Sequence, residues 1–201
     1  MLEEAGWRDS DGDGVRECHG CLYSEEGDLM RMEMTTYTEY GELLLLTQQM
    51  IGEMLKSIGI DFKLTAIEGS QLWGDYGSGG IEQTGNFDMD LYDDGYPGFD
   101  PTDFLWEYYA IDAANPDSGG NVGRWINQEF DNLLASTYTL DEEYRKDAFC
   151  QMAKILDNDL PQILLFTVIN ADAYNNTKVA GIQSNANGVV TWNVADWVLV
   201  K

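Results

Sequence analysis

The hydrophobic period of the chain changes twice between residues 30 and 67, and this change constrains the fold more than any other feature. Residues 30–36 (MRMEMTT) alternate apolar and polar side chains, as a half-buried strand does. Residues 43–58 repeat apolar side chains at helical spacing, and Gly59 follows as a helix stop. Residues 60–67 (IDFKLTAI) alternate again. The apolar positions that predict the helix are Leu43, Leu46, Met50, Met54 and Ile58.

The same kind of alternation continues along the chain. A short helix is expected at residues 70–76 with Ser70 as its N-cap, followed by a glycine-rich loop at residues 77–86 (GSGGIEQTGN). Residues 87–92 predict a third strand, and residues 163–168 (ILLFTV) a fully buried one. Further helices are expected at residues 103–109, 127–136 and 141–158, and strand-forming residues return at 189–200. Strands and helices that alternate in this way predict an α/β fold, and the length favours one domain over residues 1–201.

The net charge of the chain limits the kinds of molecule that it can bind. It has 36 acidic and 11 basic residues, which gives a net charge of −25. A chain this acidic repels phosphate, so we expect no nucleic acid and no anionic membrane as a partner, whereas cations and cationic ligands fit. A heavily solvated surface would also account for the charge. No apolar run is long enough to cross a bilayer.

A loop near the N-terminus, DSDGDGVRE, has the pattern of a calcium site. Asp9, Asp11 and Asp13 stand at alternate positions, and Ca²⁺ prefers six to eight oxygen ligands. The carbonyl of Val15 and the carboxylate of Glu17 would complete the set. An EF-hand has a glutamate at its twelfth position, where this chain has a glycine, so the loop predicts a structural calcium site outside a full EF-hand. The alternative is an acidic turn without an ion.

Two cysteines follow this loop. Cys18 and Cys21 would form a short disulfide across a hairpin in an oxidising compartment. A zinc site with His19 and Cys150 is a weaker alternative, because structural zinc usually has four ligands. His19 is the single histidine, and it stands on a polar loop where no serine has a His–Asp relay. We therefore expect no catalytic residues and no enzyme.

Four segments resemble one family. In order and spacing they are similar to the C-terminal lobe of the extracellular solute-binding proteins of family 5, the oligopeptide-, dipeptide- and nickel-binding proteins of ABC importers. The resemblance covers nearly the whole chain. The segments are residues 2–17 (LEEAGWRDSDGDGVRE), 50–68 (MIGEMLKSIGIDFKLTAIE), 87–105 (FDMDLYDDGYPGFDPTDFL) and 130–166 (FDNLLASTYTLDEEYRKDAFCQMAKILDNDLPQILLF).

The resemblance implies an architecture for the chain. It would be one lobe of a periplasmic-binding-protein-like type II fold, a mixed sheet flanked by helices. Residues 1–28 would form the calcium-type loop and hairpin, with residues 1–7 as the last turns of a helix. Residues 185–201 would form a tail that packs towards a missing N-terminal lobe. That lobe would carry the signal sequence and a lipid anchor, which places the protein outside the cytoplasm.

The resemblance also implies a function. The protein would enclose a small solute, such as an oligopeptide or dipeptide, between two lobes and deliver it to the permease subunits of an ABC importer. The cleft would lie where aromatic and acidic residues follow the strands, because ligands of α/β sheets bind beyond the carboxyl ends of strands. The residues expected there are Tyr37, Tyr40, Trp73, Tyr92, Asp93, Asp94 and Tyr96.

One position departs from the family. The aspartate that holds a peptide's ammonium group falls on Pro97 of this chain, and Asp93 or Asp94 would have to replace it. The alternative interpretation of the aromatic residues is structural: they would cover the edge of the hydrophobic core. The rival function is a calcium-dependent extracellular interaction module, in which the acidic loop is the working part, and a hydrolase fragment is a distant third.

Overall fold

The computed structural model describes residues 1–95, 100–116, 119–168, 171–185 and 190–200. The chain forms two compact units. Residues 1–94 and 115–123 make the first, which we call the sheet unit, and residues 95–114 and 124–201 make the second, the helical unit. Each unit is described by itself, and the expected single domain stays a prediction.

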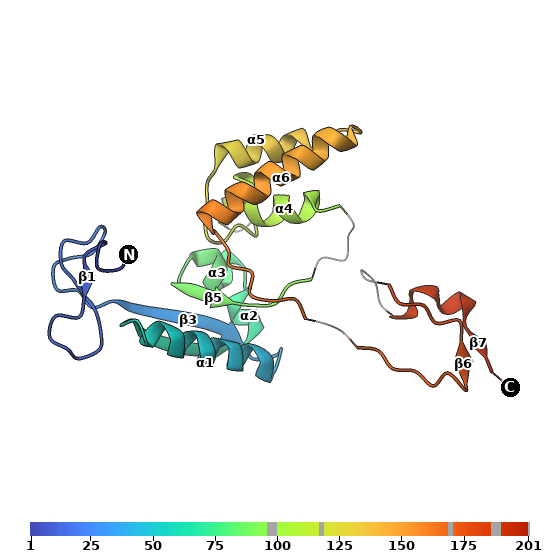
Figure 1. Ribbon diagram of the computed structural model, residues 1–201, viewed down its shortest axis with the longest axis horizontal. Coiled ribbons are helices and arrows are strands. Elements are labelled where there is room, and N and C mark those ends of the chain that lie inside the picture. Colours follow the sequence, from blue (N-terminus) through green and yellow to red (C-terminus); the bar gives the residue numbers. More distant parts are fainter. Residues whose placement is uncertain (96–99, 117–118, 169–170, 186–189, 201) are drawn as a thin grey trace. The chain divides into compact units, whose positions relative to one another are not determined.

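Three parallel strands form the centre of the sheet unit (Figure 1). Strand β3 (Arg31–Tyr37) lies between β4 (Asp61–Ile67) and β5 (Met89–Leu91). It pairs with β4 along its whole length, and its second half pairs with β5. The buried hydroxyl of Thr36 donates a hydrogen bond to the carbonyl of Leu91 at 2.6 Å, which joins the two strands further. The predicted α/β class and all three of these strands are confirmed.

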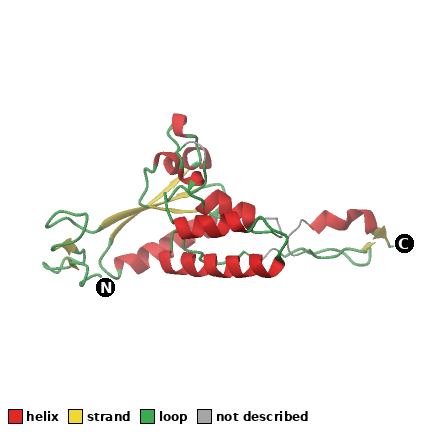
Figure 2. Ribbon diagram, turned by 90° about the horizontal axis from the view of Figure 1, so that it is seen from above, coloured by secondary structure: helices red, strands yellow, loops and turns green. Residues whose placement is uncertain are grey.

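Helix α1 (Glu42–Lys56) covers one face of β3 and β4 (Figures 1 and 2). Its buried residues are Leu44, Gln48 and Gly52, so the apolar positions that predicted the helix are exposed instead. The Gln48 amide donates to the carbonyls of Met34 at 2.7 Å and Thr65 at 3.0 Å. These two hydrogen bonds hold the Gln48 side of α1 against the sheet, and the spacing of apolar residues in the sequence does not predict that side.

Short helices connect β4 to β5. They are α2 (Gly69–Leu72), the 3₁₀ turn η1 (Tyr76–Ser78) and α3 (Ile81–Thr84). The expected helix at residues 70–76 is thus shorter, and Glu68, not Ser70, is its N-cap residue. The expected loop at residues 77–86 contains α3. Gly80 lies against the backbone of Gly74, where a Cβ atom would collide with the Gly74 carbonyl, so the glycines allow this compact connection.

A small hairpin stands at the N-terminus. Strand β1 (Trp7–Arg8) pairs antiparallel with β2 (Glu17–Cys18) around the acidic loop. Residues 2–6 form turns and Trp7 starts β1, so the expectation of a helix end over residues 1–7 is wrong. Arg16 donates to the carbonyls of Ile58 at 2.7 Å and Trp7 at 3.0 Å, and so ties the hairpin to the end of α1.

The helical unit is built around three helices, α4 (Thr102–Tyr109), α5 (Gln128–Ser136) and α6 (Glu142–Asp159), with the 3₁₀ turn η2 (Asp112–Ala114) after α4. All three helices were predicted. Asn127 and Asp141 cap α5 and α6 by accepting hydrogen bonds from the Phe130 and Tyr144 N–H groups. Phe130 and Leu134 are completely buried in its core.

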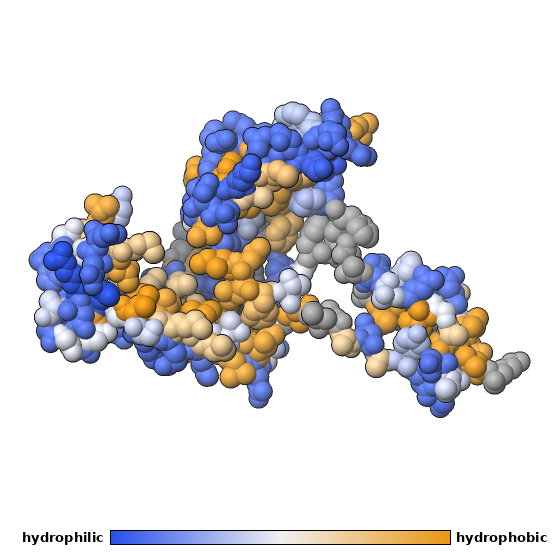
Figure 3. Space-filling view, in the orientation of Figure 1, coloured by the Kyte–Doolittle hydropathy of each residue, from blue (hydrophilic) through white to orange (hydrophobic). Residues whose placement is uncertain are grey.

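The C-terminal part differs most from expectation. Residues 163–168 form no strand, and their apolar side chains are exposed, Leu164 by 87%. The predicted buried strand is therefore wrong: none of the described strands pairs with this run. The tail consists of η3 (Val190–Asp196) and the two-residue strands β6 (Val179–Ala180) and β7 (Val198–Leu199). Figure 3 shows apolar surface around the sheet and in this tail. Among the described helices, none has the length and apolar character that crossing a membrane requires.

Candidate functional site

Two residues that follow neighbouring strands meet at one edge of the sheet. Tyr37 is the last residue of β3, and Asp93 lies two residues beyond β5. Since β3 and β5 are parallel, their carboxyl ends lie at the same edge. The Tyr37 hydroxyl donates a hydrogen bond to the Asp93 carboxylate. The structure thus brings together two of the residues that the sequence assigned to the cleft.

Aromatic rings gather around Tyr37. The Trp73 ring lies 4.5 Å from it between centroids, at an interplanar angle of 56°, and the Tyr40 ring lies at 6.2 Å. Tyr37 is buried, whereas Trp73 remains 47% exposed. Trp73 packs closely on Gly69, where a Cβ atom would come within 2.8 Å of the indole ring. We call the rings of Tyr37, Tyr40 and Trp73 the aromatic wall, and Trp73 is its exposed member.

The start of α2 is held by a carboxylate from the loop after β3. Glu39 accepts hydrogen bonds from the backbone N–H of Gly69 at 2.8 and 3.1 Å. These bonds lower the pKa of Glu39, because they favour its charged form. Glu39 therefore fixes the element that carries Trp73.

The remaining residues expected in the cleft are Tyr92, Asp94 and Tyr96. Tyr92 is half-buried and packs against the core of the sheet unit. Asp94 is exposed. Tyr96, like Pro97, lies outside the described residues. All seven assignments remain predictions of function, although the structure collects five of them at or near one edge of the sheet.

Sequence reasoning missed a pair of buried carboxyl groups behind this wall. Glu82, on α3, is only 8% exposed, and its carboxyl group lies beside that of Asp90 on β5. Burial, and secondarily the neighbouring Asp90, raises the pKa of Glu82 to about 8. Burial also raises the pKa of Asp90. The one sign of this pair in the sequence is Asp90, an acidic residue between the apolar Met89 and Leu91 of a short strand.

The edge of the sheet has the chemistry of a binding site. An exposed indole ring offers apolar and cation–π contact, and a nearby carboxylate offers a partner for a positive group. Both lie beyond the carboxyl ends of parallel strands, where ligands of α/β folds bind.

The acidic loop has the geometry of a cation site. One carboxylate oxygen from each of Asp9, Asp11, Asp13 and Glu17 lies within 4.8 Å of the others. The aspartates also accept backbone N–H bonds within the loop, for example from Gly12 to Asp9 at 2.7 Å. Bonds from the Ser10 backbone and hydroxyl lower the pKa of Glu17.

The cysteines beside the loop are thiols in this structure. Cys18 is buried, and the Cys21 N–H donates to its sulfur at 3.1 Å. Burial, and then the neighbouring Cys18 thiol, raises the pKa of Cys21. His19 bonds Glu26 at 2.8 Å and Ser10 at 3.1 Å, so it does not join the cysteines as a metal ligand here. The disulfide between Cys18 and Cys21 stays a prediction.

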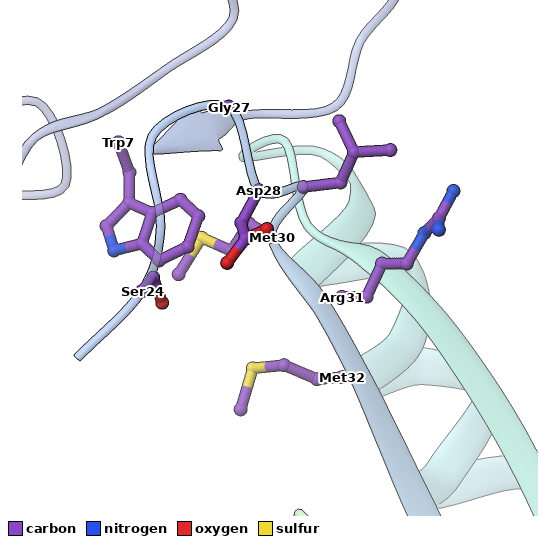
Figure 4. Close-up of a pocket in the computed structure, with 8 residues that line it drawn as sticks. Trp7, Ser24, Gly27, Asp28, Met30, Arg31 and Met32 are labelled. Carbon is purple, nitrogen blue, oxygen red and sulfur yellow. The ribbon is translucent and has the colours of Figure 1, made fainter. Parts of the chain in front are cut away.

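An open hollow lies at the other end of β3. It has a volume of about 620 Å³, and in Figure 4 Trp7, Asp28 and Met30 lie together while the Arg31 side chain extends away. Its walls come from the hairpin, residues 24–30 and the first residues of β3. Because it is at the amino end of the strand, it is not where an α/β sheet binds its ligand.

The fold of the chain is similar to that of periplasmic binding proteins, among them a periplasmic oligopeptide-binding protein from Thermotoga maritima, which aligns with a TM-score of 0.69 and 22% identity over 96% of this chain and 35% of that protein. In sequence, the chain is similar to the oligopeptide-binding protein AppA of Bacillus subtilis, with 24% identity over 216 residues. This similarity covers 100% of the chain and 34% of AppA. No protein-family model matches the chain.

Two solved structures illustrate the similarity. NikZ from Campylobacter jejuni, in complex with Ni(L-His), aligns with a TM-score of 0.71 and 22% identity over 98% of this chain and 37% of NikZ. The oligopeptide-binding protein from Thermus thermophilus, complexed with a pentapeptide, aligns with a TM-score of 0.65 and 25% identity over 80% of this chain and 27% of that protein. The chain thus spans about a third of the length of the curated relative that it matches.

Proposed function

We propose that the chain is the C-terminal lobe of a solute-binding protein of an ABC importer. It would capture a small solute against the edge formed by Tyr37, Trp73 and Asp93 and deliver it to the permease outside the cytoplasm. The observation that carries this proposal is the similarity of the whole chain to an oligopeptide-binding protein. The aromatic wall with its carboxylate supports it, because the wall lies at the edge of the sheet where such folds bind ligands.

A peptide-like solute is the first choice for the ligand. AppA is an oligopeptide-binding protein, and the Thermus thermophilus relative holds a pentapeptide. A peptide's N-terminal ammonium group would pair with Asp93 or Asp94, and an apolar side chain would pack on Trp73. The rival, a calcium-dependent interaction module, finds no support among these relatives.

The test is an NMR titration of the isotope-labelled 201-residue chain with a defined pool of pentapeptides and, separately, with Ni(L-His). We expect chemical-shift changes at Tyr37, Trp73 and Asp93 with a pentapeptide, and weak affinity, because a lobe offers only part of an enclosing surface. Trp73→Ala should lower that affinity at least tenfold, and Trp192→Ala in the tail is the matched control. Shift changes confined to other residues, or none with any probe, would contradict the proposal.

We further propose that the acidic loop binds Ca²⁺ as a structural ion. Its donor set fits a hard cation, since four carboxylates converge and the Glu17 Oε1 atom is buried without a hydrogen-bond partner. Asp9, Asp11, Asp13 and Glu17 would hold the ion, with the Val15 carbonyl as a further ligand. The ion would stiffen the hairpin.

A further inference from the structure

The carboxyl groups of Glu82 and Asp90 meet behind the aromatic wall. Asp90 pairs in register with Thr35 of β3, so both side chains lie on the same face of the sheet. That face also carries Tyr37, two residues beyond Thr35, because side chains of a strand alternate. Glu82 approaches Asp90 from α3, which packs beside α2, and Trp73 is the C-cap residue of α2.

Each carboxyl group has a buried oxygen atom without a donor. Glu82 Oε1 and Asp90 Oδ2 are both inaccessible to solvent, and no described group donates a hydrogen bond to either. An ionised carboxylate in this position would lose its hydration without replacement. Two adjacent carboxylates would also repel each other. A single proton between the groups removes both difficulties, because one oxygen becomes a donor and the other accepts.

No described positive charge acts on the pair in place of a proton. Among the residues that the structure describes, the charged group that acts on Glu82 is Asp90. The titratable groups on the elements around the pair are engaged elsewhere. Glu33 pairs with Lys63, Asp88 accepts from the Glu33 N–H, Glu39 accepts from Gly69, and Tyr37 donates to Asp93.

Trp73 is the link between the pair and the surface. The Trp73 side chain lies close enough to the Glu82 carboxyl group to lower its pKa, as an indole N–H beside a carboxylate does, while its ring packs on Tyr37. A protonated Glu82 can donate to Asp90 and still accept from Trp73. If the proton leaves, repulsion between two buried charges separates the carboxylates, and the acceptor that orients the indole moves.

We infer that Glu82 and Asp90 share one proton at neutral pH and act as positioning residues for Trp73, which ties solute affinity to pH. The part that concerns solute rests on the proposed function. The pair itself touches no solute, since both unpaired oxygens are buried. Burial that raises the pKa of Glu82 to about 8 is consistent with retention of the proton at pH 7.

The first test needs no solute. Carboxyl ¹³C signals of the labelled 201-residue chain are followed by NMR from pH 5 to pH 10. We expect one Glu or Asp carboxyl group to titrate near pH 8, to lose this transition in Glu82→Gln, and to titrate at lower pH in Asp90→Asn, which removes the neighbouring charge but not the burial. Titration of every carboxyl group below pH 6 in the unmodified chain would overturn the inference, whatever the variants do.

The second test follows the orientation of Trp73. Its fluorescence is obtained as the difference between the chain and a Trp73→Phe variant at each pH. We expect a change centred near pH 8 that Glu82→Gln abolishes, because a glutamine amide donates to Asp90 at every pH and its oxygen still accepts from the indole. Glu53→Gln on the exposed side of α1 is the matched control and should keep the change. A change near pH 8 that survives in both Glu82→Gln and Asp90→Asn would contradict the link.

The third test adds a pentapeptide that binds at pH 7. We expect its affinity to fall about fivefold between pH 7 and pH 9, as a difference of one pKa unit between the free and the solute-bound chain would give, and to stay constant in Glu82→Gln. Constant affinity in the unmodified chain would overturn the tie between solute and proton. If the carboxyl group and Trp73 titrate but no solute binds at any pH, the proposed function fails and the positioning of Trp73 stands.

Discussion

The rings of Tyr37 and Trp73 lie 4.5 Å apart between centroids, although 35 positions separate the two residues along the chain, counted from their numbers. Tyr37 is the last residue of a central strand, and Trp73 directly follows a four-residue helix as its C-cap. This contact turns the end of the sheet into an aromatic wall, with Asp93 held at its base by the Tyr37 hydroxyl. It is the geometric centre of the proposed solute site.

The hydrogen bond from Tyr37 to Asp93 should stabilise the sheet unit. Tyr37→Phe keeps the ring contact with Trp73 but removes the donor. We expect the free energy of unfolding to fall by about 1.5–3 kcal/mol, the usual range for a hydrogen bond to a charged group. Urea denaturation measures the change, and Tyr138→Phe on the exposed surface is the control. An unchanged stability would show that Asp93 finds another donor.

The stability of the chain should depend on the Glu82 proton. The pKa of Glu82 is about 8 in the folded chain, well above the 4.5 of an exposed glutamate, so the folded state binds the proton more tightly. Stability is then fully present below pH 4.5 and declines as the pH rises to about 8. We expect Glu82→Gln to remove this decline and to be about 2–4 kcal/mol more stable than the unmodified chain at pH 9.

Thermal unfolding at several pH values between 4 and 10 measures this difference. Glu53→Gln should follow the unmodified chain throughout. Parallel curves for the unmodified chain and Glu82→Gln would mean that Glu82 is ionised in the folded state.

Calcium should stabilise the hairpin if the acidic loop is a cation site. A ligand at a hundred times its dissociation constant stabilises the folded state by about 2.7 kcal/mol. We expect 10 mM Ca²⁺ to raise the melting temperature and EDTA to reverse the rise. Asp11→Asn should abolish the response, because it keeps the acceptor for the Asp13 N–H but loses the charge.

The matched control for the loop is Glu4→Gln, which changes an exposed acid outside it. Calorimetric titration with Ca²⁺ gives the affinity directly. An equal response of Asp11→Asn and the unmodified chain would place the ion elsewhere.

The core of the helical unit should depend on Phe130. This ring is completely buried and packs against Tyr109 and Trp125, with centroids 5.8 and 5.2 Å away. Phe130→Ala should lower the free energy of unfolding by about 3–5 kcal/mol. Leu140→Ala is the control, since Leu140 is fully exposed and should change stability by less than about 0.5 kcal/mol. Similar losses in both variants would contradict this core.

The connection between α2 and α3 should tolerate no side chain at Gly80. A Cβ atom there would collide with the Gly74 carbonyl, and a backbone atom cannot move aside as a flexible side chain can. We expect Gly80→Ala to destabilise the sheet unit by about 2 kcal/mol or more and to shift the Trp73 fluorescence. Gly123→Ala, at a site with open space, should have little effect. Normal stability of Gly80→Ala would disprove the close approach.

Periodicity in the sequence predicted the elements of both units well where a strand or helix is long. The strands at β3 and β4 and the helices α1, α4, α5 and α6 appear within a few residues of their expected bounds. Their patterns are local, because alternation and helical spacing arise from the geometry of the chain itself. The short helices between β4 and β5 were missed in part, because four residues carry too little periodic signal.

The local pattern does not predict which side of α1 packs on the sheet, or whether residues 163–168 form a strand. The apolar positions of α1 face outwards because the hydrogen bonds of Gln48 and the small Gly52 decide which side meets the sheet. The run at 163–168 has strand-forming residues, but a strand exists only when another strand pairs with it. Both depend on partners far away in sequence.

The α/β class, the acidic loop and the aromatic and acidic residues that follow the strands are all visible in the amino-acid pattern. Which of these residues meet depends on how the chain folds in space. The fold placed Tyr37 against Trp73 and Asp93, and it buried Glu82 beside Asp90, which no spacing in the chain could show. The physical reason is that parallel strands collect residues from distant segments at one edge, and the environment there, not the residue type, sets whether a carboxyl group keeps its proton.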